Sequence, residues 1–240
     1  MANTDADLRV TRDSQKDWYR NIVSLRKSIE LYADLVDDPA DADVLVRHEM
    51  AVKQAHEEPA IIMRPFEDAT IYDPIAAAIQ WPFDHPSNSR YSIGAYGVWY
   101  GAQSIETSVR ETVHHFRKNT LASQVAAQSK KPIVQERRVH LVHCNALLVD
   151  LRERTRKESR LLHPDDYTTC QAIGAELRHS GMPGVLTYSA RHANSEVIAV
   201  FTPTVLKDPR TVCYLTYTLF AETGKVIVER TPGKVEFEIS

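Results

Sequence analysis

The chain has 240 residues, of which 43% are hydrophobic and 25% are charged, and its formal net charge is −3. Such a composition can form a substantial core, so one large domain or a domain with an appendage is expected. The small net charge excludes a global field that would draw the protein to nucleic acid or an anionic membrane. No segment approaches the roughly twenty apolar residues that span a bilayer.

Localisation is inferred from the N-terminus and the cysteines. MANTDADLRV lacks the apolar run of a signal peptide. Three widely spaced cysteines, Cys144, Cys170 and Cys213, favour reduced thiols over a disulfide framework. We therefore expect a cytoplasmic protein whose thiols are small core residues.

Two helices are predicted near the N-terminus. Apolar residues recur there at spacings of four and three: Trp18, Ile22, Leu25, Ile29, Tyr32 and Val36. This spacing is typical of an amphipathic helix, and a second helix is predicted over residues 41–57. We interpret residues 1–58 as an N-terminal helical extension that packs on the rest of the chain. Pairing with another chain, as in a homo-oligomer, is the alternative.

After Pro59, short strand-like runs alternate with loops and helices. AIIMR and GVWYGA are predicted strands, and PFEDATIYDP and WPFDHPSNS are predicted loops because of their Pro, Asp, Asn and Ser content. Ser104 is a predicted N-cap of a helix through about Arg117.

The second half of the chain is also mixed. VHLVHCNALLVDL, GVLTYSAR and EVIAVFTP are predicted strands, and DYTTCQAIGAELRHSG is a predicted helix that ends at Gly181. After Thr211, turn signals at 222–224 and 231–233 predict an antiparallel meander. Residues 59–240 are therefore expected to form an α+β domain of mixed or antiparallel sheets with flanking helices.

Common catalytic motifs are absent from the sequence. It contains no GxSxG elbow, Walker loop, strand-linked GxGxxG or HExxH. His140 and His143 would point to opposite faces of a strand, so they are poor joint metal ligands. We expect no metal site.

Two polar segments remain as candidates for a site. In SRYSIGAYGVWYGAQSIETSVRE, a helical wheel places Glu111 opposite the apolar stripe, which by itself predicts a solvated side chain. The glycines of the same stretch, Gly94 and Gly97, would allow close approach of a ligand. Far downstream, Ser189 and Arg191 alternate on an otherwise apolar strand.

Taken in order, these motifs resemble the RES-domain family, named for an arginine, a glutamate and a serine. Its members include toxins of bacterial toxin–antitoxin pairs. The family's arginine–aromatic pair, Tyr-x-Ala-x-Ser junction and following glutamate correspond to Arg90-Tyr91, Tyr100 to Ser104, and Glu111. Twenty-one positions separate Arg90 from Glu111, as in familiar members.

The later family segment is similar to Gln171, in a helix, followed by Ser189-Ala190-Arg191. The resemblance spans about residues 60–205, which leaves out the N-terminal helices and the meander. Two departures leave the three name-giving residues in place: Ser92 replaces the usual Asn, and Tyr188 replaces the usual Pro.

The resemblance implies an ADP-ribosyltransferase-like core and an enzyme that consumes NAD. Glu111 would stabilise the oxocarbenium-like state formed when the nicotinamide–ribose bond breaks. Arg90 would bind the pyrophosphate, with Arg64 or Arg191 as a second cation. Ser189 would orient the sugar or the amide.

The remaining assignments complete the NAD site. Tyr91 or Tyr100 would stack on the nicotinamide, and Gln171 is assigned to the same binding set. The expected function is an NAD-degrading toxin, an NAD phosphorylase or glycohydrolase, with inorganic phosphate as co-substrate in the first case.

Two alternatives stay open, a protein ADP-ribosyltransferase and a binding protein that has lost turnover. Besides NAD, the expected partner is a cognate antitoxin, with no membrane and no direct nucleic acid.

Overall fold

The structure is a computed structural model that describes residues 11–24, 75 and 77–240. The chain divides into two compact units, Met1–Val23 with Asp73–Ser240, and Ser24–Tyr72. All helices and strands described below lie in the first unit. The predicted helix over 41–57 and the predicted strand AIIMR lie outside the described residues.

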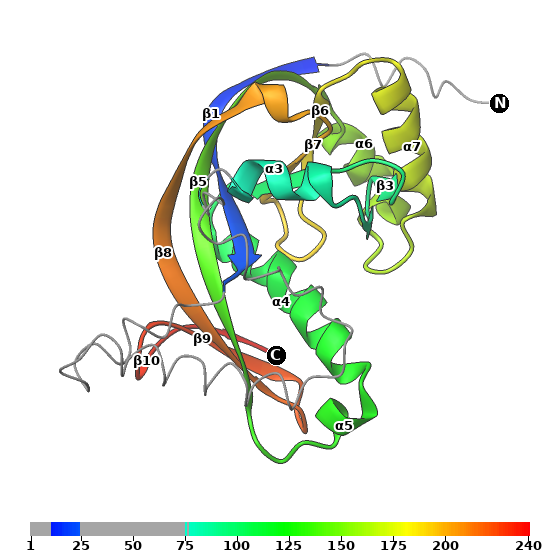
Figure 1. The fold of residues 1–240 in the computed structure, drawn as a ribbon. Helices are drawn as coiled ribbons and strands as arrows, with labels where there is room; N and C mark the ends of the chain where they lie inside the picture. Colours follow the sequence, from blue (N-terminus) through cyan, green and yellow to red (C-terminus); the bar gives the residue numbers. More distant parts are fainter. Residues whose placement is uncertain (1–10, 25–74, 76) are drawn as a thin grey trace. The chain divides into compact units, whose positions relative to one another are not determined.

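An eight-stranded sheet organises this unit (Figure 1). Its strand order is β1 (Thr11–Val23), β4 (Trp99–Ala102), β7 (Glu196–Val200), β6 (Gly184–Tyr188), β5 (Ile133–Asp150), β8 (Leu206–Phe220), β9 (Lys225–Thr231) and β10 (Lys234–Ile239). The β5–β6 pair is parallel and the other pairs are antiparallel. A two-stranded sheet joins β2 (Asn88–Ser89) to β3 (Ser92–Ile93). The mixed sheet and its helices confirm the predicted α+β class.

Five of the strands close into a ring. β1 pairs along most of its length with β5 and, at Tyr19, with β4, so the order β1-β4-β7-β6-β5 returns to β1. One buried cluster takes residues from all five strands: Trp18, Trp99, Ile198, Leu186 and Leu148. The cluster therefore fills the interior of the ring.

The helix predicted from Trp18 is wrong for its first six residues, because Trp18–Val23 belongs to strand β1. A spacing of four, as between Trp18 and Ile22, places side chains on one helix face but also on one face of a strand. Extensive pairing with β5 favours the strand here. The rest of that predicted helix lies outside the described residues.

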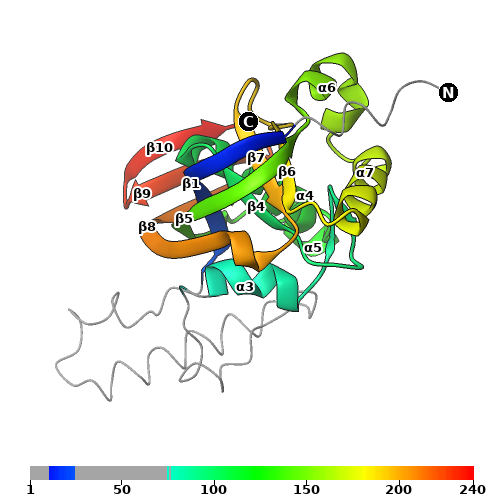
Figure 2. The ribbon, with the colours of Figure 1, turned by 90° about the horizontal axis from the view of Figure 1, so that it is seen from above.

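The helices cover the sheet at different places, as the view from above shows (Figure 2). They are α3 (Ala77–Asp84), α4 (Ile105–Leu121), α5 (Gln124–Ala127), α6 (Arg152–Lys157) and α7 (Thr168–His179), with short 3-10 turns at Ser159–Leu162 and Pro203–Val205. The apolar stripe of α4 packs against β5, β8 and β9, whereas α7 packs in a separate cluster with β6 and β7.

Helix α3 replaces part of the loop predicted for WPFDHPSNS. Pro82 lies inside the helix and lacks the N–H that would reach the carbonyl of Ala78. The indole of Trp99 donates to that carbonyl instead, at 2.8 Å. A Cβ on Gly97 would lie 2.2 Å from the Pro82 carbonyl oxygen. The missing side chain therefore lets α3 pack closely here, and not a ligand as the sequence predicted.

The C-terminal meander is confirmed. β8, β9 and β10 pair antiparallel in succession. The turns between them contain Gly224 and Gly233, whose φ angles of 69° and 78° lie in the left-handed region that favours glycine.

Candidate active site

Helix α4 positions Glu111. Ser104 is its N-cap, as predicted, and its hydroxyl accepts a 3.1 Å hydrogen bond from the Thr107 amide. Val109 and Val113 are buried on the apolar side, whereas the Glu111 side chain lies off that stripe and is 24% exposed. The carboxylate is therefore free of the core but not fully solvated.

Ser189 meets Glu111 from the turn between β6 and β7. Its hydroxyl donates to Glu111 Oε1 at 2.6 Å and accepts from the backbone amides of Arg191, at 3.1 Å, and His192, at 2.9 Å. Because a hydroxyl has one proton and two lone pairs, these three bonds use its full capacity. Ser189 is 3% exposed, and because two amides donate to its oxygen, its one proton is left for Glu111.

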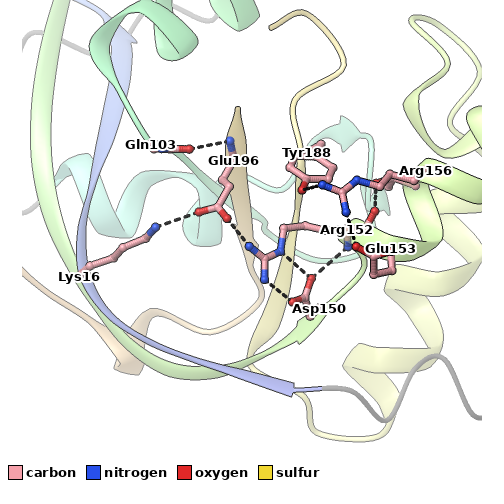
Figure 3. Close-up of polar contacts among 9 residues, drawn as sticks. Lys16, Gln103, Asp150, Arg152, Glu153, Arg156, Tyr188 and Glu196 are labelled. Carbon is pink, nitrogen blue, oxygen red and sulfur yellow. Dashed lines mark hydrogen bonds and ion pairs between the residues drawn. The ribbon is translucent and has the colours of Figure 1, made fainter. Parts of the chain in front are cut away.

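A network of charged residues anchors the base of the Ser189 turn (Figure 3). Glu196, paired in register with Tyr188, binds Lys16 at 2.9 Å and also Arg152, which in turn holds Asp150. The desolvated carboxylates of Asp150 and Glu196 nevertheless have lowered pKa values, because Arg152 donates to both and Lys16 to Glu196. The two strands that carry the turn are thereby fixed to β1 and α6.

Two hydrogen-bonded links join this turn to the start of α4. Gln103 Oε1 accepts from the Glu196 amide at 3.0 Å, and the Gln103 amide donates to the Glu196 carbonyl at 3.0 Å. Further along, His192 Nδ1 lies 2.9 Å from Thr107 Oγ1. Thr107 is fully buried one helical turn before Glu111, so His192 ties both halves of the Glu111–Ser189 pair together.

Arg191 lies beside the same carboxylate. Its Nε is 3.7 Å from Glu111 Oε2, and its Nη2 donates to the Pro164 carbonyl at 2.6 Å and to Tyr167 Oη at 3.2 Å. The side chain is only 8% exposed. A buried guanidinium next to one carboxylate retains spare donors for an anion.

Arg90 joins the cluster through Tyr167. Its guanidinium carbon lies 4.6 Å from the centroid of the Tyr167 ring, and Nη1 donates to the Leu161 carbonyl at 3.0 Å. Arg90 Nη2 and Arg191 Nε are both buried and have no hydrogen-bond partner among the described residues. Arg191 Nε therefore has only its 3.7 Å ion pair with Glu111 Oε2, and Arg90 Nη2 is a buried donor that forms no hydrogen bond within the described ranges.

Two histidines of α4 border the site without adding charge at neutral pH. Burial and, to a smaller extent, the positive charge of Arg191 lower the pKa of His115 to about 4. Burial and Arg191 also lower the pKa of His114, whose ring faces Asp165 at 3.7 Å. The charged groups of the cluster are thus Arg90, Arg191 and Glu111, with the Asp165 carboxylate at its border.

The other predicted binding residues that the structure describes form hydrogen bonds outside the Glu111–Ser189 pair. Tyr91 is 1% exposed in a hydrophobic cluster, and its amide donates to Tyr100 Oη at 3.1 Å. Burial raises the pKa of both phenols, that of Tyr100 to about 12. Gln171 clamps α7 to the small sheet by donating to Asn88 Oδ1 at 2.7 Å. Arg64 lies outside the described residues, and the stacking roles stay predictions.

The site also contains residues that sequence reasoning missed, namely Tyr167, Thr107 and His192. His192 follows Arg191 directly, so its place in the TYSARH segment was a usable signal. Among the residues that the structure describes, no group of three or more His, Cys, Asp and Glu side chains could hold a metal. No helix in the same ranges is long and apolar enough to cross a membrane.

The comparisons with known proteins identify the family. The model of the RES domain matches residues 64–219, more than half of the chain, so the chain belongs to the RES domain family. A similar solved structure is a chain of the M. tuberculosis MbcT–MbcA toxin–antitoxin complex, with 15% identity, coverage of 86% of this chain and 88% of that chain, and a TM-score of 0.43. No curated protein matches the sequence.

Proposed function

We propose that this protein is an NAD-degrading enzyme that cleaves the nicotinamide–ribose bond. The observation that carries the proposal is the Glu111 carboxylate, held by Ser189 at 2.6 Å and bordered by Arg191. A fixed carboxylate beside two buried guanidinium groups suits a substrate with a developing positive charge at a ribose and a negative diphosphate.

Glu111 supplies the negative charge in this mechanism. As the bond from the ribose C1 to the ring nitrogen breaks, its electron pair goes to the nicotinamide, which leaves neutral and needs no proton. The ribose acquires oxocarbenium character, which a nearby carboxylate stabilises. Oε1 accepts from Ser189, so Oε2, which lies 3.7 Å from Arg191 Nε, is the oxygen assigned to the sugar in this proposal.

Ser189 acts by positioning Glu111. Its proton is donated to the carboxylate and its lone pairs accept two amides, so it has neither a base nor a free lone pair with which to attack. This role differs from direct orientation of the sugar or the amide, which the resemblance to the family implies.

The acceptor that completes the reaction is inorganic phosphate or water. With phosphate, an oxygen bonds to the ribose carbon and ADP-ribose 1-phosphate forms; with water, ADP-ribose forms and one proton is released. Membership of the RES family supports action as a toxin on cytoplasmic NAD, restrained by an antitoxin protein.

Release of nicotinamide is the test. Purified protein is mixed with NAD with and without phosphate, and nicotinamide and the ribosyl product are separated by chromatography. We expect release by the wild type, with the product identifying the acceptor. A folded, antitoxin-free sample that releases none would refute the proposal, and labelled protein bands from labelled NAD would indicate protein ADP-ribosylation.

A further inference from the structure

Tyr167 contacts both arginines of the candidate site, through two different parts of its side chain. Arg90 lies over the ring, 4.6 Å from its centroid, and Arg191 Nη2 donates to the hydroxyl at 3.2 Å. The residue immediately precedes α7, whose first turn is anchored there by a 2.8 Å bond from the Gln171 amide to the Tyr167 carbonyl. The backbone of Tyr167 is therefore tied to the first turn of α7.

Two like charges that share one ring repel each other, so their proximity needs a physical reason. The face of a tyrosine ring attracts a cation and its hydroxyl oxygen accepts a hydrogen bond, so Tyr167 offsets part of this repulsion. The carbonyls of Leu161 and Pro164, on the same segment, each accept from one of the arginines. The carbonyls and the ring of this segment thus stabilise the positive charge of each guanidinium without supplying a formal negative charge.

The remaining donors indicate what the site lacks. Arg90 Nη2 and Arg191 Nε are buried and have no hydrogen-bond partner in the described part of the chain. Arg191 Nε has only the 3.7 Å ion pair with Glu111 Oε2, which is too long for a hydrogen bond. Leaving buried charged donors without hydrogen bonds is costly, and a diphosphate offers acceptor oxygens on two linked groups, one for each arginine.

We infer that Tyr167 is a positioning residue that fixes Arg90 and Arg191 as a paired cradle for the diphosphate of a dinucleotide. The inference rests on the proposed function for the identity of the dinucleotide. The paired anion site itself does not depend on turnover. Tyr167 touches neither Glu111 nor Ser189 by any contact described above, so it acts on binding rather than on the bond-breaking step.

Two variants separate the contributions of Tyr167. Tyr167→Phe keeps the ring under Arg90 and loses the hydroxyl, and should raise KM for NAD about threefold to tenfold. Tyr167→Leu loses both and should raise KM about tenfold to a hundredfold. In both, kcat should stay within about twofold of wild type.

The matched control is Tyr214→Leu. Tyr214 lies on β8 under Arg138, with the guanidinium 5.1 Å from the ring centroid, and is not one of the site residues described above. This variant should leave KM unchanged. Thermal unfolding of all three variants verifies that they are folded.

Calorimetric titration with inorganic pyrophosphate gives a readout that is independent of catalysis. Affinity should fall in the order wild type, Tyr167→Phe, Tyr167→Leu. If wild type releases no nicotinamide, the proposed function fails, and this titration still decides the role of Tyr167. Unchanged pyrophosphate affinity in folded Tyr167→Leu, or a fall in kcat without a rise in KM, would overturn the inference.

Discussion

The Ser189 hydroxyl and the Glu111 carboxylate, 78 positions apart in the chain, form a 2.6 Å hydrogen bond in which the serine is the donor. Two backbone amides occupy the lone pairs of the serine. The carboxylate thus has one fixed oxygen and one that faces Arg191, and this asymmetry underlies the predictions that follow.

Glu111→Gln should remove most of the nicotinamide release. The amide oxygen can still accept from Ser189, so the geometry persists while the negative charge is lost. We expect kcat to fall about a hundredfold to ten-thousandfold with an unchanged unfolding midpoint. The control is Glu176→Gln, on the exposed side of α7, which should behave like wild type. An unfolded Glu111→Gln protein would instead assign Glu111 a structural role.

Ser189→Ala should lower kcat less than Glu111→Gln does. Loss of a hydrogen bond to a charged group corresponds to about tenfold to a hundredfold in rate, and the Arg191 and His192 amides lose their acceptor, which should destabilise the fold by about 1 to 3 kcal/mol. Chromatographic rates and urea unfolding measure the two effects. Complete inactivation together with a covalent adduct on wild-type Ser189 would show that it is a nucleophile.

Thr107 and His192 should be energetically coupled. Thr107→Val and His192→Ala each break the 2.9 Å link, so the double variant should lose little more activity than the worse single variant. The loss should appear in kcat rather than KM, because the link orients Glu111. Thr112 lies elsewhere on α4, and its hydroxyl bonds Tyr217 on β8. Thr112→Val should therefore combine additively with His192→Ala. Additivity in both pairs would contradict the coupling.

Arg152→Met should be much more destabilising than Arg156→Met. Arg152 is 19% exposed and bridges two carboxylates, Asp150 and Glu196, so its loss leaves them uncompensated and should cost about 3 kcal/mol of unfolding free energy. Arg156 is 56% exposed, and its ion pair should contribute about 1 kcal/mol or less. Urea titration measures both; equal losses would mean that the Arg152 network carries no special weight.

Stability should fall as the pH drops from 6.5 toward 4. Burial lowers the pKa of His140 from 6.5 to about 4, so in this window the unfolded state binds the proton and the native state does not, which favours unfolding. His115 acts in the same direction. His140→Leu should flatten the dependence in urea titrations, whereas His179→Leu, at an exposed position, should retain it. An unchanged slope in His140→Leu would refute this assignment.

Local patterns predicted the elements whose signals are self-contained. The cap at Ser104, the stripe of Val109 and Val113 and the glycines of the meander turns each act within a few residues, and the structure agrees with them. The strand at Trp18 was misread because its apolar spacing fits two periodicities, and only pairing with distant β5 decides between them.

The candidate site was predictable only in part. The wheel placed Glu111 away from the core, but nothing near it in the chain specifies Ser189 as its partner. Tyr167 carries no local signal either, because its role arises from two arginines that lie 77 positions before it and 24 positions after it. Tertiary contacts of this kind follow from the strand order and not from any single motif.

The match to the family model does not include every strand of the five-stranded ring. The match begins at residue 64, yet β1, more than forty positions earlier, supplies Trp18 to the ring interior and the long pairing with β5. A fragment cut at the limits of the match would expose the free edge of β5 and an unfilled interior. Strand β1, which closes the ring, therefore lies outside the part of the chain that matches the family model.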